Sequence, residues 1–284
     1  MNDRSILKQL PKHLIFRILH FSLISQQLRD ELGGRAGGGE VRTKEDFSKA
    51  LEWQPFALWL SNILLNYAGD IMGNLLLGLL PLEPLCDVSD VLLSSLIWYC
   101  IFYCPFDLGH DLANSIGFRF LATTMSTISQ LQLIERGVHQ AGQVYNNAIV
   151  PMLIVGTVMG SGAEVLKPMA GILINRCQQN QLAYIKMSNN SKLALFLSIL
   201  YVLEIYKSPL ILGLTRHQLL VYSLVMTMTF KFLSLAYRME HFIWLMEHRL
   251  CYTFFGGLSG DLRKFFKHQR KAHIRQGWMH SEYD

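Results

Sequence analysis

The sequence feature that most limits the possible folds is a long stretch without a formal charge, from Gly137 to Ala163. A helix needs about 20 mainly apolar residues to cross a bilayer, and a soluble core helix rarely stays uncharged this long. Within it, the polar residues Gln143, Asn146 and Asn147, followed by Pro151, predict a turn between two helices. The second helix reaches membrane length only by continuing through the small residues that follow.

Those small residues stand directly before an acid. Gly160, Ser161, Gly162 and Ala163 precede Glu164. Inside a membrane helix, such a cluster either lets another backbone come close or lets the helix bend beside a cavity. We therefore expect the functional centre of the chain near this point.

Composition supports a membrane setting. The 284-residue chain is 51% hydrophobic and only 17% charged, with a mean hydropathy of +0.24. No cleavage site follows the first apolar run, so we expect that helix to stay attached. Five cysteines, an odd number without paired metal spacing, predict reduced side chains rather than a disulfide framework. The net charge of +5 lies mainly near the C-terminus, which indicates a basic tail and not a nucleic-acid-binding body.

Apolar runs divide the chain into an N-terminal helix with a Gly-rich linker (1–50), a transmembrane core (51–237) and a basic tail (238–284). The first run contains Arg17 and is either a span or an interfacial helix. The fold predicted is thus an all-α integral membrane protein with seven transmembrane helices. Their expected ranges are 13–28, 53–80, 91–106, 116–134, 149–174, 193–214 and 219–237.

The distribution of Lys and Arg predicts an orientation. With seven spans, the loops that share a side with the tail hold 16 Lys and Arg, tail included, against 5 on the other side. Positive loops stay cytosolic, so the C-terminus is expected in the cytosol and the N-terminus in the lumen.

A weak internal symmetry links the second and fifth spans. Ala68-Gly69-Asp70 and Gly162-Ala163-Glu164 both place small residues before an acid near the middle of a helix. Three spans separate them, so spans one to three and four to six would be copies of opposite topology. Inverted repeats with interrupted helices point to a permeation or binding site near the midplane.

Several blocks of sequence resemble the trimeric intracellular cation channels. These are SSLIWYCIFYCPFDL (94–108), RGVHQAGQVYNN (136–147), GTVMGSGA (156–163), YIKMSNNSKL (184–193) and the lysine at 231. The resemblance implies 3+3 inverted repeats plus a seventh helix, a homotrimer with one pore per subunit, and an endoplasmic or sarcoplasmic reticulum or nuclear membrane. It also implies potassium passage as counter-ion while calcium leaves the store.

The chain departs from the family at its basic residues. The lysine and arginine that the family uses for an anionic inositol lipid fall on Ser126 and Gln130, the next lysine on Leu133, and the fifth-span arginine on Met159. Arg136 is a candidate displaced substitute. We therefore expect no cofactor, except for an anionic inositol lipid that would have to bind without the usual pair.

The candidate pore and hinge residues each carry two interpretations. Asp70 and Glu164 either line a cation path or form structural ion pairs with Arg136, Lys167 or Lys231. The small residues Ala68, Gly69, Gly73 and Gly160–Ala163 mark either unwound backbone that offers carbonyls to a cation or close-packed helix crossings. Lys231 either sets a gate or limits conductance by repulsion, or it snorkels or pairs with Asp70.

No motif favours an enzyme, and the Cys104, Asp107, His110 and Asp111 group fits a capped helix end better than a metal site. The function expected is a potassium-permeable channel of intracellular membranes, with lipid and potassium ions as partners. The alternatives are a non-conducting scaffold that keeps the trimer, and a transporter.

Overall fold

The computed structural model describes residues 13–32, 54–104, 108–173, 188–207, 215–237, 249 and 252. The described part of the chain is helical and contains no strand. It divides into two compact units, Met1–Met228 and Thr229–Asp284.

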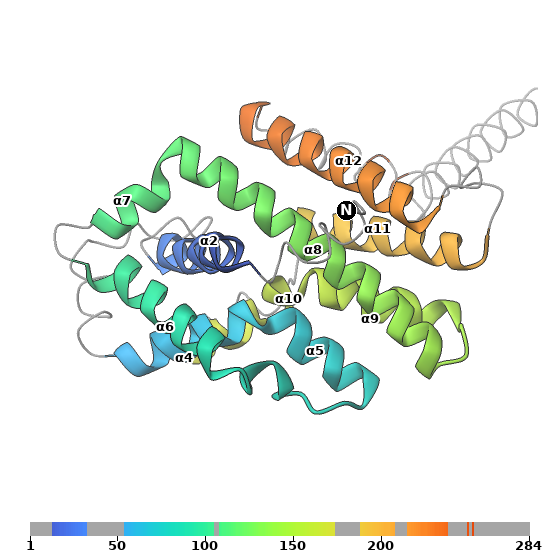
Figure 1. Cartoon of the computed structure of the whole chain (residues 1–284), viewed down its shortest axis with the longest axis horizontal. Coiled ribbons are helices and arrows are strands. Elements are labelled where there is room, and N and C mark those ends of the chain that lie inside the picture. Colours follow the sequence, from blue (N-terminus) through green and yellow to red (C-terminus); the bar gives the residue numbers. More distant parts are fainter. Residues whose placement is uncertain are drawn as a thin grey trace, which may run out of the picture. The chain divides into compact units, whose positions relative to one another are not determined.

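The helices follow one another along the chain as labelled in Figure 1. They are α2 (Leu14–Leu32), α4 (Pro55–Asn66), α5 (Ala68–Leu77), the 3₁₀ turn η2 (Glu83–Leu85), α6 (Val88–Tyr103), α7 (Leu108–Asn114), α8 (Ile116–Val144), α9 (Ile149–Gly160), α10 (Gly162–Leu173), α11 (Asn189–Ile205) and α12 (Arg216–Tyr237).

Local sequence explains several of these boundaries. The side chains of Asp87, Ser115 and Ser188 accept hydrogen bonds from the first turns of α6, α8 and α11, as helix-capping residues do. Gly78 ends α5 in the left-handed conformation (φ 72°), which a residue without Cβ adopts at no steric cost.

The predicted turn before Pro151 is present. The residues 145–148 separate α8 from α9, and Asn146 and Asn147 have φ values of 48° and 58°, in the region that asparagine tolerates. However, α8 runs to Val144, ten residues beyond the expected end of the fourth span at 134. The helix continues through Glu135 and Arg136 because each of them has a partner of opposite charge, as described below.

The predicted spans are not found as single helices of membrane length. No single helix in the described ranges is both long and apolar enough to cross a bilayer alone. Two bent pairs satisfy the length and composition requirement together: α6 with α7, bent by 102°, and α9 with α10, bent by 61°. The second pair corresponds to the predicted fifth span, 149–174.

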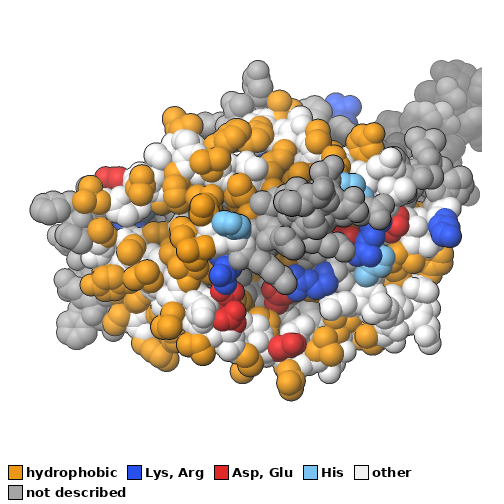
Figure 2. Space-filling view, in the orientation of Figure 1, with side chains coloured by type: hydrophobic (Ala, Val, Ile, Leu, Met, Phe, Trp, Pro, Cys, Tyr) orange, Lys and Arg blue, Asp and Glu red, His pale blue; other side chains and the backbone are white. Residues whose placement is uncertain are grey.

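The surface of the described part carries many large apolar side chains. Figure 2 shows them spread over the visible face, with the charged residues gathered in a few places. Examples on four helices are Leu96, Phe120, Ile154 and Val225, which are 60%, 48%, 50% and 60% exposed. Such a surface suits contact with lipid.

The N-terminal run is a bundle helix, not an interfacial one. Helix α2 packs against α4, α6, α7 and α8, and it buries residues on several sides, including Phe16, Phe21, Ser25 and Leu28. It also extends to Leu32, past the expected end at 28. The first apolar run therefore belongs to the core of the bundle.

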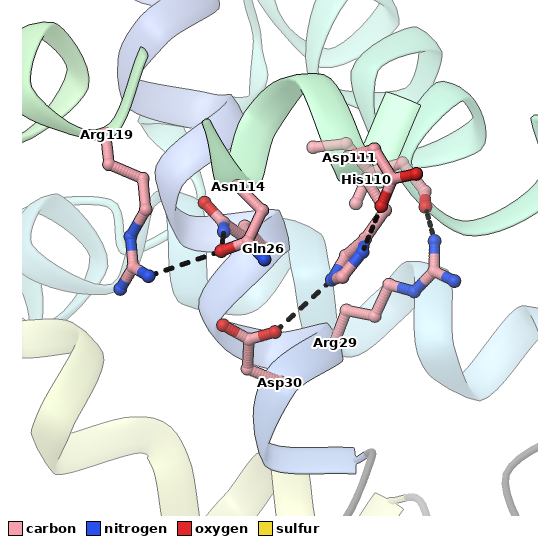
Figure 3. A network of polar contacts seen from close by, with 8 residues as sticks. Gln26, Arg29, Asp30, His110, Asp111, Asn114 and Arg119 are labelled. Atoms are coloured by element: carbon pink, nitrogen blue, oxygen red, sulfur yellow. Dashed lines mark hydrogen bonds and ion pairs between the residues drawn. The ribbon is translucent and has the colours of Figure 1, made fainter. Parts of the chain in front are cut away.

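Polar contacts hold the end of α2 against α7 (Figure 3). Gln26 donates to Asn114 over 3.3 Å, and His110 lies 3.3 Å from Asp30 and 3.9 Å from Asp111. Arg29 donates to the carbonyl of Ile101. His110 thus takes part in a contact between helices; Asp107 lies outside the described residues.

Candidate functional site

The two helices singled out by sequence are both broken by one residue. Tyr67 separates α4 from α5, with φ −105° and ψ 7°, and Ser161 separates α9 from α10, with φ −119° and ψ 18°. In each break the residue donates its N–H to the residue four before it and accepts from the residue four after it. The two breaks therefore have matching backbone geometry, with a single residue between the two helices in each, and α9 and α10 meet at a bend of 61°.

The broken helices cross at their breaks. Helix α4 packs against α10, and α5 packs against α9 and α10. A methyl group added at Gly162 would lie 2.3 Å from the backbone nitrogen of Gly69, and one added at Gly69 would lie 2.4 Å from the carbonyl oxygen of Met159. Only glycine permits this approach, so the small residues serve both a bend and a close crossing.

Further glycines admit neighbouring side chains. A methyl group at Gly73 or Gly137 would meet the flexible side chain of Met159, at 2.5 and 2.7 Å. Gly160 faces Ile134 in the same way, at 2.3 Å. Met159 thus fills the space between α5, α8 and α9, a role that its unbranched side chain suits.

Each candidate acid has a basic partner. Asp70 accepts a hydrogen bond from Arg136 of α8 over 2.9 Å, and Glu164 lies 3.2 Å from Lys167, one turn later on α10. The acid side chains are 30% and 22% exposed. Arg136, one of the partners considered for Asp70, thus pairs with it in the structure.

Gln130 provides a hydrogen-bond donor for a backbone carbonyl at the second break. Its side-chain nitrogen donates to the carbonyl oxygen of Gly160 over 2.9 Å, from α8 across to the end of α9. Ser161 and Thr157 bond the carbonyls of Thr157 and Leu153 within α9. Gln130, which the sequence analysis singled out only because the family has a basic residue there, thus stabilises the bend between α9 and α10.

A third ion pair near this site was not predicted from sequence. Glu135 is 7% exposed and accepts from Arg216, which opens α12 within the first unit. The adjacent positions Glu135 and Arg136 face different partners, so they anchor α8 to two other helices. Lys231 lies further along α12, within the second unit, and its expected role stays a prediction.

Comparison with known proteins identifies the family. The family model of the TRIC channels matches residues 44–238, and this range includes both broken helices. The chain belongs to the TRIC channel family. It is therefore related to ion channels and not to enzymes.

Several relatives of this TRIC chain are similar along most of its length. Trimeric intracellular cation channel type B of Mus musculus is 31% identical over 64% of the chain, and type B of Danio rerio 26% over 70%. Type 1B.2 of Caenorhabditis elegans is 27% identical over 90%. The matches cover 62%, 64% and 78% of the relatives' own lengths, so the chain spans slightly less than two thirds of the two vertebrate proteins.

Solved TRIC structures have the same fold. A trimeric intracellular cation channel from C. elegans, solved without Ca²⁺, superposes with a TM-score of 0.67 at 25% identity. The superposition covers 81% of this chain and 93% of that one. The all-helical fold and the family resemblance predicted from the sequence are thus confirmed.

Proposed function

We propose that this TRIC chain forms a homotrimeric potassium channel of intracellular membranes, with one pore in each subunit. Its relatives are named trimeric intracellular cation channels, and a structure of the same fold is described as a counter-ion channel in calcium release. The proposed role is potassium flow that balances charge while calcium leaves an endoplasmic or sarcoplasmic reticulum store. A nuclear membrane location would serve the same role.

One observation carries the proposal: two broken helices cross at glycines, and an acid follows each break. Asp70 comes three residues after Tyr67, and Glu164 three residues after Ser161. Matching interruptions in two halves of a membrane protein are typical of inverted repeats with a permeation site between them. The proposed architecture is therefore 3+3 inverted repeats plus a seventh helix, with Lys231 on the last.

The acids give this site its preference for cations. Asp70 forms an ion pair with Arg136, and both side chains are partly exposed. The pair therefore contributes little to stability, on the order of 1 kcal/mol. A passing cation competes with Arg136 for the carboxylate. Removing the acid would leave the positive charge of Arg136 alone beside the path and repel cations.

The test compares Asp70→Asn, Arg136→Gln and the double variant in planar bilayers with a potassium gradient. The proposal predicts a smaller unitary conductance for Asp70→Asn, an unchanged or larger one for Arg136→Gln, and an intermediate value for the double variant. Equal loss of trimer from both single variants, with normal conductance in the trimers that remain, would show that the pair is only structural. Silent wild-type trimers would favour the scaffold, and stoichiometric coupling to a second solute a transporter.

Gating by an anionic inositol lipid is a further part of the proposal. Gln130 is bonded to Gly160, and Ser126 carries no charge, so Arg136 is the candidate contact for a lipid phosphate. A phosphate there would compete with Asp70 for the guanidinium. The lipid should then change the open probability of wild type and have no effect on Arg136→Gln.

The proposed topology places the N-terminus in the lumen and the basic tail in the cytosol, following the excess of Lys and Arg on the side of the tail. Protease added to sealed microsomes should remove an epitope tag from the C-terminus and leave one at the N-terminus intact. Protection of the C-terminal tag would contradict this orientation.

A further inference from the structure

Helix α7 buries one side and exposes another. Ala113 is 3% exposed, so its side chain lies inside the bundle. Leu108 and Leu112, one turn apart on another side of the helix, are 61% and 65% exposed. The same spacing of four residues continues across Ser115 to Ile116 at the start of α8, which is 88% exposed. We call Leu108, Leu112 and Ile116 the apolar stripe.

Contacts with α2 and α6 determine which side of α7 faces outward. His110 lies 3.3 Å from Asp30 of α2, and Asn114 accepts a hydrogen bond from Gln26 over 3.3 Å (Figure 3). Gly109 lies so close to α6 that a methyl group added there would be 2.1 Å from a backbone carbonyl oxygen of that helix. Because these contacts hold two sides of α7, the apolar stripe keeps its outward direction.

The direction of α7 follows from its angle to α6. The two helices are bent by 102°, and Figure 1 shows α7 leading away from α6 toward α8. Helix α6 exposes apolar side chains along its length, since Val88, Leu92 and Leu96 are 66%, 64% and 60% exposed. A transmembrane helix is tilted by about 20° on average, so α7 lies roughly in the plane of a membrane that α6 crosses. In that direction α7 adds almost no depth to the span.

Aromatic rings indicate the level of α7 in the membrane. Tyr99 and Tyr103, one turn apart at the end of α6, stack with their ring centroids 5.7 Å apart, and the ring of Trp98 lies 5.3 Å from that of Tyr103. Tyr99 is 57% exposed. Tyr and Trp gather where the apolar core of a bilayer meets the headgroups. Helix α7 begins five residues after Tyr103 and packs against α6, which places it at the same boundary.

The charges near the apolar stripe favour a neutral lipid surface. From 105 to 118 the sequence contains no Lys or Arg, and its acids are Asp107 and Asp111. The side chain of Asp111 is 75% exposed. Basic residues attract anionic headgroups, whereas apolar side chains enter the boundary of a bilayer by burying their surface. The residues of α7 therefore suit burial of apolar surface and not recognition of a charged lipid.

We propose that α7 is an interfacial helix, with Leu108, Leu112 and Ile116 inserted at the boundary between headgroups and acyl chains. The partner is the lipid surface, and zwitterionic lipid is sufficient. Helices α6 and α7 are then a span followed by an anchor in the membrane plane, and not one broken span. Because α7 is bonded to the end of α2, the anchor also fixes the depth of that helix. The inference does not depend on ion conduction.

The test measures depth by spin labelling of the full-length protein in phosphatidylcholine nanodiscs. The native cysteines are replaced by serine, and a nitroxide is attached to Leu108→Cys, Leu112→Cys or Ile116→Cys in separate proteins. Asp111→Cys is the matched control, because it is exposed on the same helix but lies outside the apolar stripe. The accessibility of each nitroxide to oxygen, which concentrates in lipid, is compared with its accessibility to a water-soluble nickel chelate.

The inference predicts an oxygen-to-nickel accessibility ratio at least severalfold higher at Leu108 and Leu112 than at Asp111. The depths of the two leucine positions should differ by at most about 3 Å, half of the roughly 6 Å that four residues of a crossing helix span. Addition of phosphatidylserine to the nanodiscs should leave the ratios unchanged. Ile116→Cys replaces a leucine variant that fails to fold, so that two positions of the stripe always report the ratio.

Four results would overturn the inference, and they are distinguishable. Nickel accessibility at the apolar stripe as high as at Asp111 would place α7 in water. Exclusion of both oxygen and nickel would show that protein, such as a second copy of the chain, covers the stripe. A depth difference near 6 Å between Leu108 and Leu112 would make α6 and α7 one broken span. Insertion only with phosphatidylserine would show recognition of an anionic lipid.

Discussion

The crossing of the broken helices makes a specific prediction about Gly162→Ala. The added methyl group would lie 2.3 Å from the nitrogen, 2.4 Å from the Cα of Gly69 and 2.6 Å from the carbonyl carbon of Ala68. Ordinary contacts begin at 3.4 Å, so α10 and α5 have to separate by about 1 Å. All three neighbours are backbone atoms, which no side-chain rotation can move away.

The magnitude follows from two opposing terms. Overpacking of this kind costs about 1–3 kcal/mol, and alanine in place of glycine in a helix returns about 0.5–1 kcal/mol. The net loss of unfolding free energy is then about 0–2.5 kcal/mol, with a central value of about 1 kcal/mol. For a protein of this size, each kcal/mol lowers the melting temperature by about 2–4 °C.

The matched control is Gly171→Ala on the same helix. A methyl group at Gly171 meets no atom within 4 Å, so the substitution should leave the protein as stable or stabilise it by up to about 1 kcal/mol. The assay is thermal unfolding of purified protein in one detergent, followed by tryptophan fluorescence. If Gly162→Ala melts at or above the wild-type temperature, as Gly171→Ala should, the close crossing is refuted.

Two further predictions concern the polar contacts of α8. Arg216→Gln leaves the buried carboxylate of Glu135 without its partner and should destabilise the protein by about 1–3 kcal/mol. The control Arg119→Gln loses only an exposed contact with Asn114 and should change stability by less than about 0.5 kcal/mol. Equal melting temperatures of the two variants would contradict this prediction. Gln130→Met keeps the length of the side chain and removes its donor to the Gly160 carbonyl, so the bend between α9 and α10 should lose rigidity and single-channel open probability should change at constant unitary conductance. An altered conductance at constant open probability would instead place Gln130 in the ion path.

The sequence was most informative where residue type restricts the backbone. The turn between α8 and α9 could be predicted because Asn146, Asn147 and Pro151 interrupt an apolar run. The glycine cluster from 160 to 163 predicted either a bend or a close approach, and it provides both, because the break at Ser161 brings Gly162 against Gly69.

Other features depend on partners that are distant in the sequence. The break in the second predicted span falls on Tyr67 and not on Gly69, since Gly69 is needed for the crossing itself. The length of α8 could not be inferred because Glu135 is compensated by Arg216, 81 residues later. The spacing of Leu108, Leu112 and Ile116 is visible in the sequence, but the outward direction of these side chains depends on contacts between α7 and α2.

The most direct test of the central claim is the reversal potential of purified wild-type protein in a planar bilayer with a tenfold potassium chloride gradient. A cation channel predicts discrete steps that reverse near the potassium equilibrium potential, about 59 mV for a tenfold ratio of a singly charged ion. Well-folded trimers that give no steps, or steps that reverse near zero or at the chloride potential, would contradict the account.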